Sequence, residues 1–579
     1  MSSRRVRSTY DKSPYIPVGT AEEVSIGAAA IAVAIRATGA QVVAIETYPG
    51  VRTEDLTAIV DQLQPDLVVD VAQGYRTPAD LNALVEDDLT DDPIFGRLTA
   101  RGVVDFFDPA GLDKLRATVA EARGRVVVFG TGATLVGHPD LVVYADLARW
   151  EIQQRQRRGE IGNLAADNTG ERASLLYKRS FFLDWRAADR LKTELLDHVD
   201  LFLDTTTAGR PLLVSGDAVR RGLHLAASRP FRVVPFFDPA PWGGQWMREV
   251  CDLPDGPANY GWCFDCVPEE NSLLLGFGEE RIEIPALDLV LHRPTELLGE
   301  RVRARFGEEF PIRFDFLDTM GGGNLSLQVH PLPSQIREEF GWGYTQDESY
   351  YLLDAEPGAT VYLGLREDVD PEQMLADLQD AQEGHGDFPA ERHVNILPAR
   401  KHDHFLIPAG TVHCSGAGSM VLEISATPFI FTFKLWDWGR LGLDGLPRPI
   451  NIGRGRRAIR WDRRASYAER ELVNVLTPVG KGDGWRSERT GLHPAEPIET
   501  HRHWFDGTAP HNTDGSVNVL NLVEGEEVIA ESPTGAFPPF VVHYAETFIV
   551  PAAVGDYTVR PHGPSVGRQC ATIKAFVRP

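Results

Sequence analysis

The sequence predicts a multidomain protein in which a doubly wound α/β region precedes a longer all-β region. In the first third, apolar strands such as 41–49 and 125–136 alternate with helix-length segments, which is typical of a largely parallel sheet. From about residue 230, short apolar runs lie between Gly and Pro turns, which is typical of a β-sandwich or jelly roll. A chain of 579 residues is also too long for one ordinary core.

Composition narrows the class of partner. Asp and Glu outnumber Lys and Arg by 83 to 58, a net charge of −25, which argues against nucleic acid and against an anionic membrane. No apolar run is long enough to span a membrane. Five scattered cysteines, including a lone pair at Cys263 and Cys266 that we interpret as buried thiols, favour a reduced setting. We therefore expect a cytoplasmic protein that binds a small molecule, and a homo-oligomer stays open.

Changes in composition and in hydrophobic pattern along the chain predict four segments. Residues 1–20 are basic and lack an apolar core, so we expect a flexible arm rather than a signal peptide. An α/β domain follows at 21–225. A first all-β domain with helical insertions, near 334–341 and 371–383, occupies 230–460. A second all-β domain occupies 471–579.

The strand, turn and helix at 42–60 stand where a phosphate-binding loop stands in a nucleotide kinase. By layout, this region resembles the uridine kinase-like P-loop family, but its motif is degenerate. Glu46 and Val51 replace the glycines that let the backbone approach phosphate. We interpret the domain as a scaffold without nucleotide turnover. Nucleotide binding stays open through a set of polar candidates: Arg52, Thr53, Arg155, Arg157 and Arg158.

The clearest chemistry lies around residue 330. Gln328 and His330 are two apart in an alternating run, so both side chains point to one face of a strand. Glu348 opens another strand-like run, and His413 follows in HFLIPAGTVHCSG. Two imidazoles, a carboxylate and an amide oxygen suit a divalent metal with room left for water or substrate. Two histidine pairs are rival ligands: His402 with His404, and His501 with His503.

Two phrases, HFLIPAGTVH and TFIVPAAVGDYTV, are similar to each other. A Pro-Ala turn ahead of a ligand strand resembles the second motif of cupins, and two copies suggest a bicupin built from an internal repeat. Tyr557 stands in the second copy where the first has a ligand histidine. We therefore expect one metal site and a second, metal-free cupin domain.

Several blocks follow one another as those of type I phosphomannose isomerases do, over about residues 230–579: PFFDPAPWGGQWM, FPIRFDFLDTMGGGNLSLQVHP, DESYYLLDAEPGATVYLGL, IPAGTVHCSGAGSMVLEIS and FTFKLWDWGR. The resemblance implies interconversion of mannose 6-phosphate and fructose 6-phosphate. It also implies a zinc ion, with other divalent metals as alternatives, held by Gln328, His330, Glu348 and His413.

An aldose–ketose conversion moves a proton between C1 and C2 through an enediolate, which needs a proton carrier and stabilising positive charge. Glu423, in VLEIS, matches a family carboxylate near the metal and is the first candidate for the carrier. Lys434 is the second candidate. Arg440 is the third predicted catalytic residue, as a cation that can help to bind phosphate.

Three positions depart from the family pattern. Gln346 and Asp315 stand where the family has lysines, and Lys434 stands where it has an arginine, so positive charge is lost. Arg440 and arginines 454, 456 and 457 are cations that could rebuild a phosphate pocket. The alternatives are therefore an isomerase for an unphosphorylated or substituted sugar, and a non-catalytic sugar-sensing protein regulated by the N-terminal domain.

Overall fold

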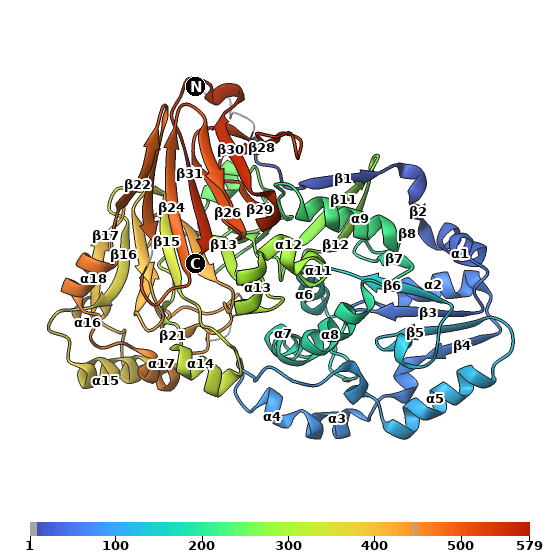
Figure 1. Ribbon diagram of the computed structural model, residues 1–579. Coiled ribbons are helices and arrows are strands. Elements are labelled where there is room, and N and C mark those ends of the chain that lie inside the picture. Colours follow the sequence, from blue (N-terminus) through green and yellow to red (C-terminus); the bar gives the residue numbers. More distant parts are fainter. Residues whose placement is uncertain (1–7, 444, 446–447, 492) are drawn as a thin grey trace. The chain divides into compact units, whose positions relative to one another are not determined.

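The computed structural model describes residues 8–579 except 444, 446, 447 and 492 (Figure 1). It divides into two compact units. The N-terminal unit contains residues 15–227 and 268–293, and the C-terminal unit contains residues 8–14, 228–267 and 294–579. Two short segments therefore depart from the linear order of the predicted domains. The mixed α/β and sheet-rich multidomain class expected from the sequence is confirmed.

The N-terminal unit contains a seven-stranded sheet in which β3 to β7 run parallel, and β8 runs antiparallel to both of its neighbours, β7 and the edge strand β2. Figure 1 shows β6, β3, β5 and β4 side by side. In spatial order the strands are β2 (Ser25–Ile26), β8 (Leu212–Ser215), β7 (Leu201–Asp204), β6 (Leu141–Asp146), β3 (Val42–Thr47), β5 (Val126–Gly130) and β4 (Leu67–Asp70). A separate three-stranded sheet contains β1 (Tyr15–Gly19), β11 (Ser272–Phe277) and β12 (Glu280–Pro285).

Helices cover both faces of the seven-stranded sheet, because its central strands are apolar on both sides. Val43 and Ile45 of β3 pack against α1 (Gly27–Ala37) and α2 (Thr53–Leu63). Ala44 faces the other way, in a core with α5 (Pro109–Glu121). The remaining helices of this unit are α3 (Pro78–Leu84), α4 (Glu86–Leu89), α6 (Arg149–Arg157), α7 (Ala173–Arg179), α8 (Trp185–Leu195), α9 (Gly216–Ala227) and α11 (Leu287–His292).

A buried ion cluster ties the late segment 268–293 into this unit. Lys192 Nζ on α8 lies 2.7 Å from Oδ2 of Asp146 and 2.9 Å from Oδ1 of Asp288. All three side chains are buried, and a buried charge persists only when it is paired. The cluster therefore holds α8, the end of β6 and α11 together.

The C-terminal unit begins with a sandwich of two antiparallel sheets. One sheet has the order β18 (His404–Ile407), β15 (Glu348–Ala355), β20 (Ser419–Ala426), β13 (Ile312–Asp318), β10 (Trp262–Cys266) and β9 (Phe236–Asp238). The other has the order β17 (Val394–Pro398), β16 (Thr360–Leu365), β19 (His413–Ser415), β14 (Leu327–Val329) and β21 (Phe433–Trp436). We call this pair the first sandwich.

The second sandwich again pairs two antiparallel sheets. Its larger sheet has the order β22 (Thr477–Gly482), β23 (Trp485–Gly491), β24 (Ile498–Phe505), β31 (Cys570–Val577), β26 (Asn518–Glu524) and β29 (Thr547–Val550). Its smaller sheet has the order β25 (Ala509–Asn512), β30 (Asp556–Pro561), β27 (Glu527–Glu531) and β28 (Phe540–His543). One apolar core joins the two sheets, through Leu520 and Leu522 of one and Val528 and Val559 of the other.

Short helices decorate the first sandwich. The two predicted insertions are present as α14 (Pro333–Phe340) and α15 (Pro371–Gln382). Asp370 caps α15 by accepting hydrogen bonds from the backbone of Glu372 and Gln373. The other helices of the unit are α10 (Trp246–Val250), α12 (Pro294–Leu298), α13 (Glu300–Phe306), α16 (Ala390–His393), α17 (Ile452–Ala458) and α18 (Ala465–Glu471).

The arm predicted for residues 1–20 is structured from residue 8 onward. Tyr10 is buried and its hydroxyl donates a hydrogen bond to Asp265, while β1 pairs in parallel with β11. Residues 1–7 lie outside the described residues. Cys263 and Cys266 are buried free thiols on β10, and burial raises the pKa of both well above the usual value. Within the described ranges, no helix is both long and apolar enough to cross a membrane.

Candidate metal centre

The four predicted metal ligands meet between the two sheets of the first sandwich. Gln328 on β14 is the direct cross-strand partner of His413 on β19, so their side chains share one face. His330 follows β14 directly, and Glu348 begins β15 in the opposite sheet. All four residues are buried, with at most 8% of their surface exposed. The pairing of β14 with β19 therefore brings together two side chains that are 85 residues apart in the sequence, and Glu348 joins them from the opposite sheet.

One carboxylate lies between two imidazoles. Oε2 of Glu348 is 3.1 Å from Nε2 of His330, and Oε1 is 2.7 Å from Nε2 of His413. In the described part of the chain, neither His330 Nε2 nor Glu348 Oε1 has a hydrogen bond of acceptable geometry. These atoms are close but not aligned as donor and acceptor. One ligand atom from each of His330, Glu348 and His413 lies within 4.8 Å of the others, which is close enough for all three to bind one cation.

The far nitrogens of both rings fix the orientation of this centre. His413 Nδ1 lies 2.9 Å from the carbonyl oxygen of Thr411, and His330 Nδ1 lies 3.4 Å from that of Phe431. A carbonyl oxygen only accepts, so each Nδ1 carries the proton and each Nε2 keeps a lone pair.

Gln328 completes the donor set. Its side-chain nitrogen Nε2 is placed 3.2 Å from His413 Nε2. The two ends of an amide are exchanged by a half turn, which would present the oxygen to the same point. A second group of acidic residues and a histidine, Asp380, Glu383 and His385, also comes within metal-binding distance, but all three are exposed on α15 and the turn after it. The buried group fits a divalent ion better, since its imidazoles and carboxylate are excluded from water.

Glu423 adjoins this centre through Gln346. The Gln346 amide donates to Oε2 of Glu348 over 2.8 Å and to Oε1 of Glu423 over 3.4 Å. Glu423 on β20 pairs directly with Asp315 on β13, so both carboxylates face the interior. Burial, reinforced by Asp315 and Glu348, raises the pKa of Glu423 well above its usual value. The predicted proton carrier is thus linked to a ligand carboxylate by one amide.

Sequence reasoning missed Arg313, which neutralises these acids. Its Nη2 lies 2.8 Å from Oδ1 of Asp315 and 3.3 Å from Oε1 of Glu423. Trp262 Nε1 donates to the other oxygen of Asp315 over 2.9 Å. The position of Arg313 two residues before Asp315 is the signal that could have found it, because residues two apart share a face of a strand. The cation lost at Asp315 is therefore supplied by a neighbouring position.

The other two predicted catalytic residues differ in their surroundings. Lys434 on β21 pairs with Gln328 across the sheet, so it lies on the same face as the ligands. Burial, reinforced by Arg448, lowers the pKa of Lys434 to about 8. Arg440 instead forms an ion pair of 2.6 Å with Asp437, which also pairs with Arg448. Lys434 therefore adjoins the centre, whereas the charge of Arg440 is engaged by an acid of its own loop.

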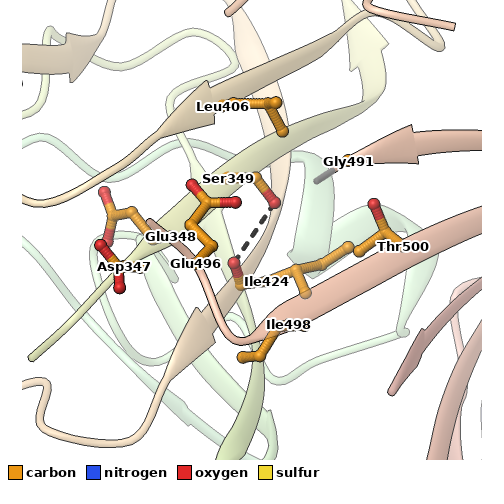
Figure 2. A pocket seen from close by; sticks show the side chains of 9 residues that line it. All are labelled: Asp347, Glu348, Ser349, Leu406, Ile424, Gly491, Glu496, Ile498 and Thr500. Carbon is orange, nitrogen blue, oxygen red and sulfur yellow. Dashed lines mark hydrogen bonds between the residues drawn. The ribbon is translucent and has the colours of Figure 1, made fainter. Parts of the chain in front are cut away.

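A small cavity adjoins Glu348. It measures about 10 Å³ and is lined by Asp347, Glu348 and Glu496 among others; Figure 2 shows these three carboxylates grouped together. Asp347 accepts a hydrogen bond of 2.8 Å from the backbone of Ala409, and burial raises its pKa to about 6. Burial also raises the pKa of Glu496 well above its usual value. A space that admits about one water molecule is too small for a sugar, so it is no substrate pocket.

The rival histidines lie outside the cluster of His330, Glu348 and His413. His402 bonds to the hydroxyl of Tyr351 over 2.9 Å and to Glu524 over 3.2 Å. His404 is buried and burial lowers its pKa to about 3. His501 lies 2.6 Å from Glu499. His503 lies in the second sandwich, and neither pair joins the cluster of His330, Glu348 and His413.

Arginines 454, 456 and 457 lie on α17. Arg454 and Arg457 pair with Glu339, and Arg456 lies 3.5 Å from Glu372. These partners belong to α14 and α15. The three arginines therefore tie surface helices together in this structure.

A cavity of about 330 Å³ opens in the N-terminal unit where β3, β4 and β5 end, beside the degenerate loop. The Glu46 carboxylate accepts hydrogen bonds from the backbone N–H groups of Gly132, at 2.5 Å, and Thr134, at 2.8 Å. Arg52 pairs with Asp55 at 2.9 Å and with Glu160 at 3.3 Å. The chain's own carboxylates thus occupy donors that a phosphate would need.

Arg155 and Arg158 of the arginine-rich stretch also donate to groups of the chain itself. Arg155 is buried and donates to the carbonyl oxygens of Gly50 and Thr205 over 3.0 and 2.5 Å. Arg158 pairs with Glu151 at 2.9 Å and with Glu160 at 2.6 Å. These arginines hold the loops together around the cavity.

Comparison with known proteins gives two separate matches. A family model described as a domain of unknown function, DUF8485, matches residues 27–228. A Bacillus subtilis protein, YvyI, provisionally named a mannose-6-phosphate isomerase, is 22% identical over 349 residues, which covers 57% of this chain and 96% of that protein. The mannose-6-phosphate isomerase of Streptococcus mutans serotype c is 26% identical, and the match covers 36% of this chain and 61% of the relative.

A solved structure is also similar. The crystal structure of the mannose 6-phosphate isomerase from Bacillus subtilis has a TM-score of 0.48 and 18% sequence identity, and it covers 60% of this chain and 99% of that chain. The chain thus spans nearly all of YvyI but less than two thirds of the length of the Streptococcus mutans relative.

Proposed function

We propose that this chain is a metal-dependent aldose–ketose isomerase of the phosphomannose isomerase type, which interconverts mannose 6-phosphate and fructose 6-phosphate. The observation that carries the proposal is the buried carboxylate of Glu348 between the Nε2 atoms of His330 and His413, with Glu423 one amide away. Sequence similarity to mannose-6-phosphate isomerases over more than half of the chain supports the choice of substrate.

Gln328, His330, Glu348 and His413 would hold the ion, and zinc suits their mixture of imidazole, carboxylate and amide donors. A bound divalent ion supplies positive charge for the sugar oxygens and so stabilises the negative charge of the enediolate. We assign the proton transfer between C1 and C2 to Glu423. Its raised pKa lets the carboxyl carry a proton near neutral pH. Lys434, on the ligand face, is the second cation beside the substrate.

A direct experiment measures interconversion of the two hexose phosphates by the zinc-loaded full chain, before and after treatment with a chelator. We expect turnover with metal, none without it, and recovery on adding zinc. Full metal occupancy with no turnover of any sugar phosphate would refute the proposal.

A second candidate is an isomerase for an unphosphorylated or otherwise substituted sugar, and one observation favours it. The family resemblance leads us to expect a lysine at position 315, but Asp315 forms a buried pair without net charge with Arg313. A second expected lysine, at position 346, is replaced by Gln346. A panel of free and phosphorylated hexoses at equal concentration separates the two. A clear preference for phosphorylated hexose excludes this version.

For the N-terminal unit we propose a P-loop kinase-like scaffold that has lost nucleotide turnover. The order of strand, turn and helix at β3 and α2 supports the relationship, and the engagement of Arg52, Glu46 and Arg155 by the chain itself supports the loss. Phosphate release from ATP by the full chain would contradict it, provided that an Arg52→Ala variant abolishes the release.

A further inference from the structure

The interior of the second sandwich changes from apolar to polar along its strands. Phe505 on β24 and Cys570 on β31 belong to the apolar core and are direct cross-strand partners. His503 and Thr572, two positions further along the same two strands, are also partners and face the same interior. Both are buried. Two polar side chains thus continue a face that begins as hydrophobic core.

A second histidine meets His503 from the opposite sheet. The ring centroids of His503 and His511 are 4.4 Å apart, and His511 stacks on the core residue Tyr557 with centroids 4.9 Å apart. Across the part of the chain that the structure describes, none of the four imidazole nitrogens has a hydrogen-bond partner, and neither does Oγ1 of Thr572. Each unpartnered buried polar atom costs about 1–3 kcal/mol. Five such atoms at one place indicate that something else binds them.

Lys574 gives this interior its charge. It lies on β31 opposite His501 and is only 7% exposed. Two acids, Asp514 and Glu499, lie near enough to act on Lys574, and Glu499 is engaged by His501 at 2.6 Å. No carboxylate in the described residues is within ion-pair distance of the Lys574 ammonium. Burial lowers the pKa of Lys574 to about 8, and burial lowers the pKa of both His503 and His511 well below the usual value, so the imidazoles are neutral.

We propose that this interior is a second ligand site, which binds a phosphate group, either as the free ion or as part of a phosphorylated metabolite. The Lys574 ammonium supplies the charge. The ring N–H groups of His503 and His511 and the hydroxyl of Thr572 supply further donors. Thr572 and Lys574 are two apart on β31 and share its inner face, so the cation and the donors line one interior, which matches an anion with several acceptor oxygens.

The contrast with the first sandwich decides between an anion and a metal. There, two imidazoles face the carboxylate of Glu348, which suits a cation. In the second sandwich the charged group is the Lys574 ammonium instead of a carboxylate. Within the described residues, no third His, Cys, Asp or Glu offers a ligand atom at metal-binding distance from His503 and His511. Two neutral ligands beside a positive charge make a poor site for a divalent cation.

The test is isothermal titration calorimetry on the zinc-loaded full chain at neutral pH, with inorganic phosphate and mannose 6-phosphate as separate probes. We expect a binding event that Lys574→Gln weakens about tenfold or more, because a charge-assisted contact is lost. Lys481→Gln, which changes an exposed lysine of the same sandwich, is the matched control and should bind as the unchanged protein does. Circular dichroism and thermal unfolding test whether each variant folds. If Lys574→Gln does not fold, His511→Leu is used in its place.

Each outcome decides the proposal. Loss of phosphate binding in the variant identifies the free ion, and loss restricted to mannose 6-phosphate identifies a phosphorylated metabolite; both support the site. Absence of binding up to millimolar probe, or equal affinity in Lys574→Gln and the unchanged chain, overturns it, because ordered water then satisfies the polar atoms. A second zinc equivalent per chain that disappears in His511→Leu also overturns it. The result with inorganic phosphate does not depend on isomerase activity.

Discussion

Arg313 and Asp315, two residues apart on β13, form an ion pair of 2.8 Å in the interior of the first sandwich. Each has at most 2% of its side chain exposed, and Glu423 lies 3.3 Å from the same Arg313 nitrogen. A buried pair of this kind is weak evidence for stability, but removing one partner leaves the other charge uncompensated. The pair therefore fixes the charge balance around Glu423.

The first prediction concerns this pair. Arg313→Met should lower the free energy of unfolding by about 3–5 kcal/mol, because Asp315 and Glu423 lose their buried cation. Adding Asp315→Leu should recover much of the loss. The denaturation midpoint measures both, and Arg301→Met, at an exposed position, is the control. Equal midpoints for the single variant and the control would show that water already compensates the acids.

A second prediction concerns the metal. His413→Asn should weaken zinc binding by about 100-fold or more, since it removes a ligand nitrogen held by Thr411. Metal content after dialysis against a weak chelator gives the result. His385→Asn, in the exposed group on the molecular surface, should retain one zinc per chain. If only the His385 variant lost zinc, the ion would be bound by Asp380, Glu383 and His385, and the prediction would be wrong.

The third prediction separates chemistry from binding. Glu423→Gln should lower kcat about 10²- to 10⁴-fold, because the proton carrier is removed while the side chain keeps its shape. Metal content and KM should change little. The variant is assayed with both hexose phosphates and its zinc is counted. A kcat within a few fold of the unchanged enzyme would transfer the role to Lys434, which a Lys434→Gln variant then tests.

Strand periodicity predicted that Gln328 and His330 share a face, and the family order with the Pro-Ala motif pointed to His413; the structure brings these residues together with Glu348. Strand periodicity could not identify Arg313 as part of the site. Every residue of β13 is buried on both faces, so the usual difference between an apolar inner face and a polar outer face is absent. Here the polar residues face the interior, while Phe314 and Phe316 lie on the other face. Local pattern therefore could not say which face would line the site.

Long-range contacts account for the other differences. The sequence separates the N-terminal domain from the all-β region near residue 225, yet 268–293 packs with the N-terminal unit. Asp288 in that segment meets Lys192 only because two strands bring it back, and no local signal marks such a pairing. Arg440, predicted as a cation that can help to bind phosphate, forms an ion pair with Asp437 three residues before it.

The last prediction concerns Glu46 and pH. Burial raises the pKa of Glu46 from 4.5 to about 7, against the hydrogen bonds that it accepts from Gly132 and Thr134. The folded state therefore binds a proton that the unfolded state releases earlier. The stability that this proton provides is complete below about pH 4.5 and is lost as the pH rises to about 7, by about 3 kcal/mol at most.

Glu46→Gln removes this titration. The amide also loses acceptor capacity, but that loss does not vary with pH, and the other buried acids of the unit, Glu270 and Glu283, are the same in both proteins. The difference in stability between the unchanged chain and the variant should therefore shift in favour of the variant as the pH rises from about 5 to about 7. Hydrogen–deuterium exchange of the peptide 42–47, compared between the two at each pH, measures it. Parallel pH profiles would mean that Glu46 is ionised in the folded chain, with Gly132 and Thr134 holding its charge at no net cost.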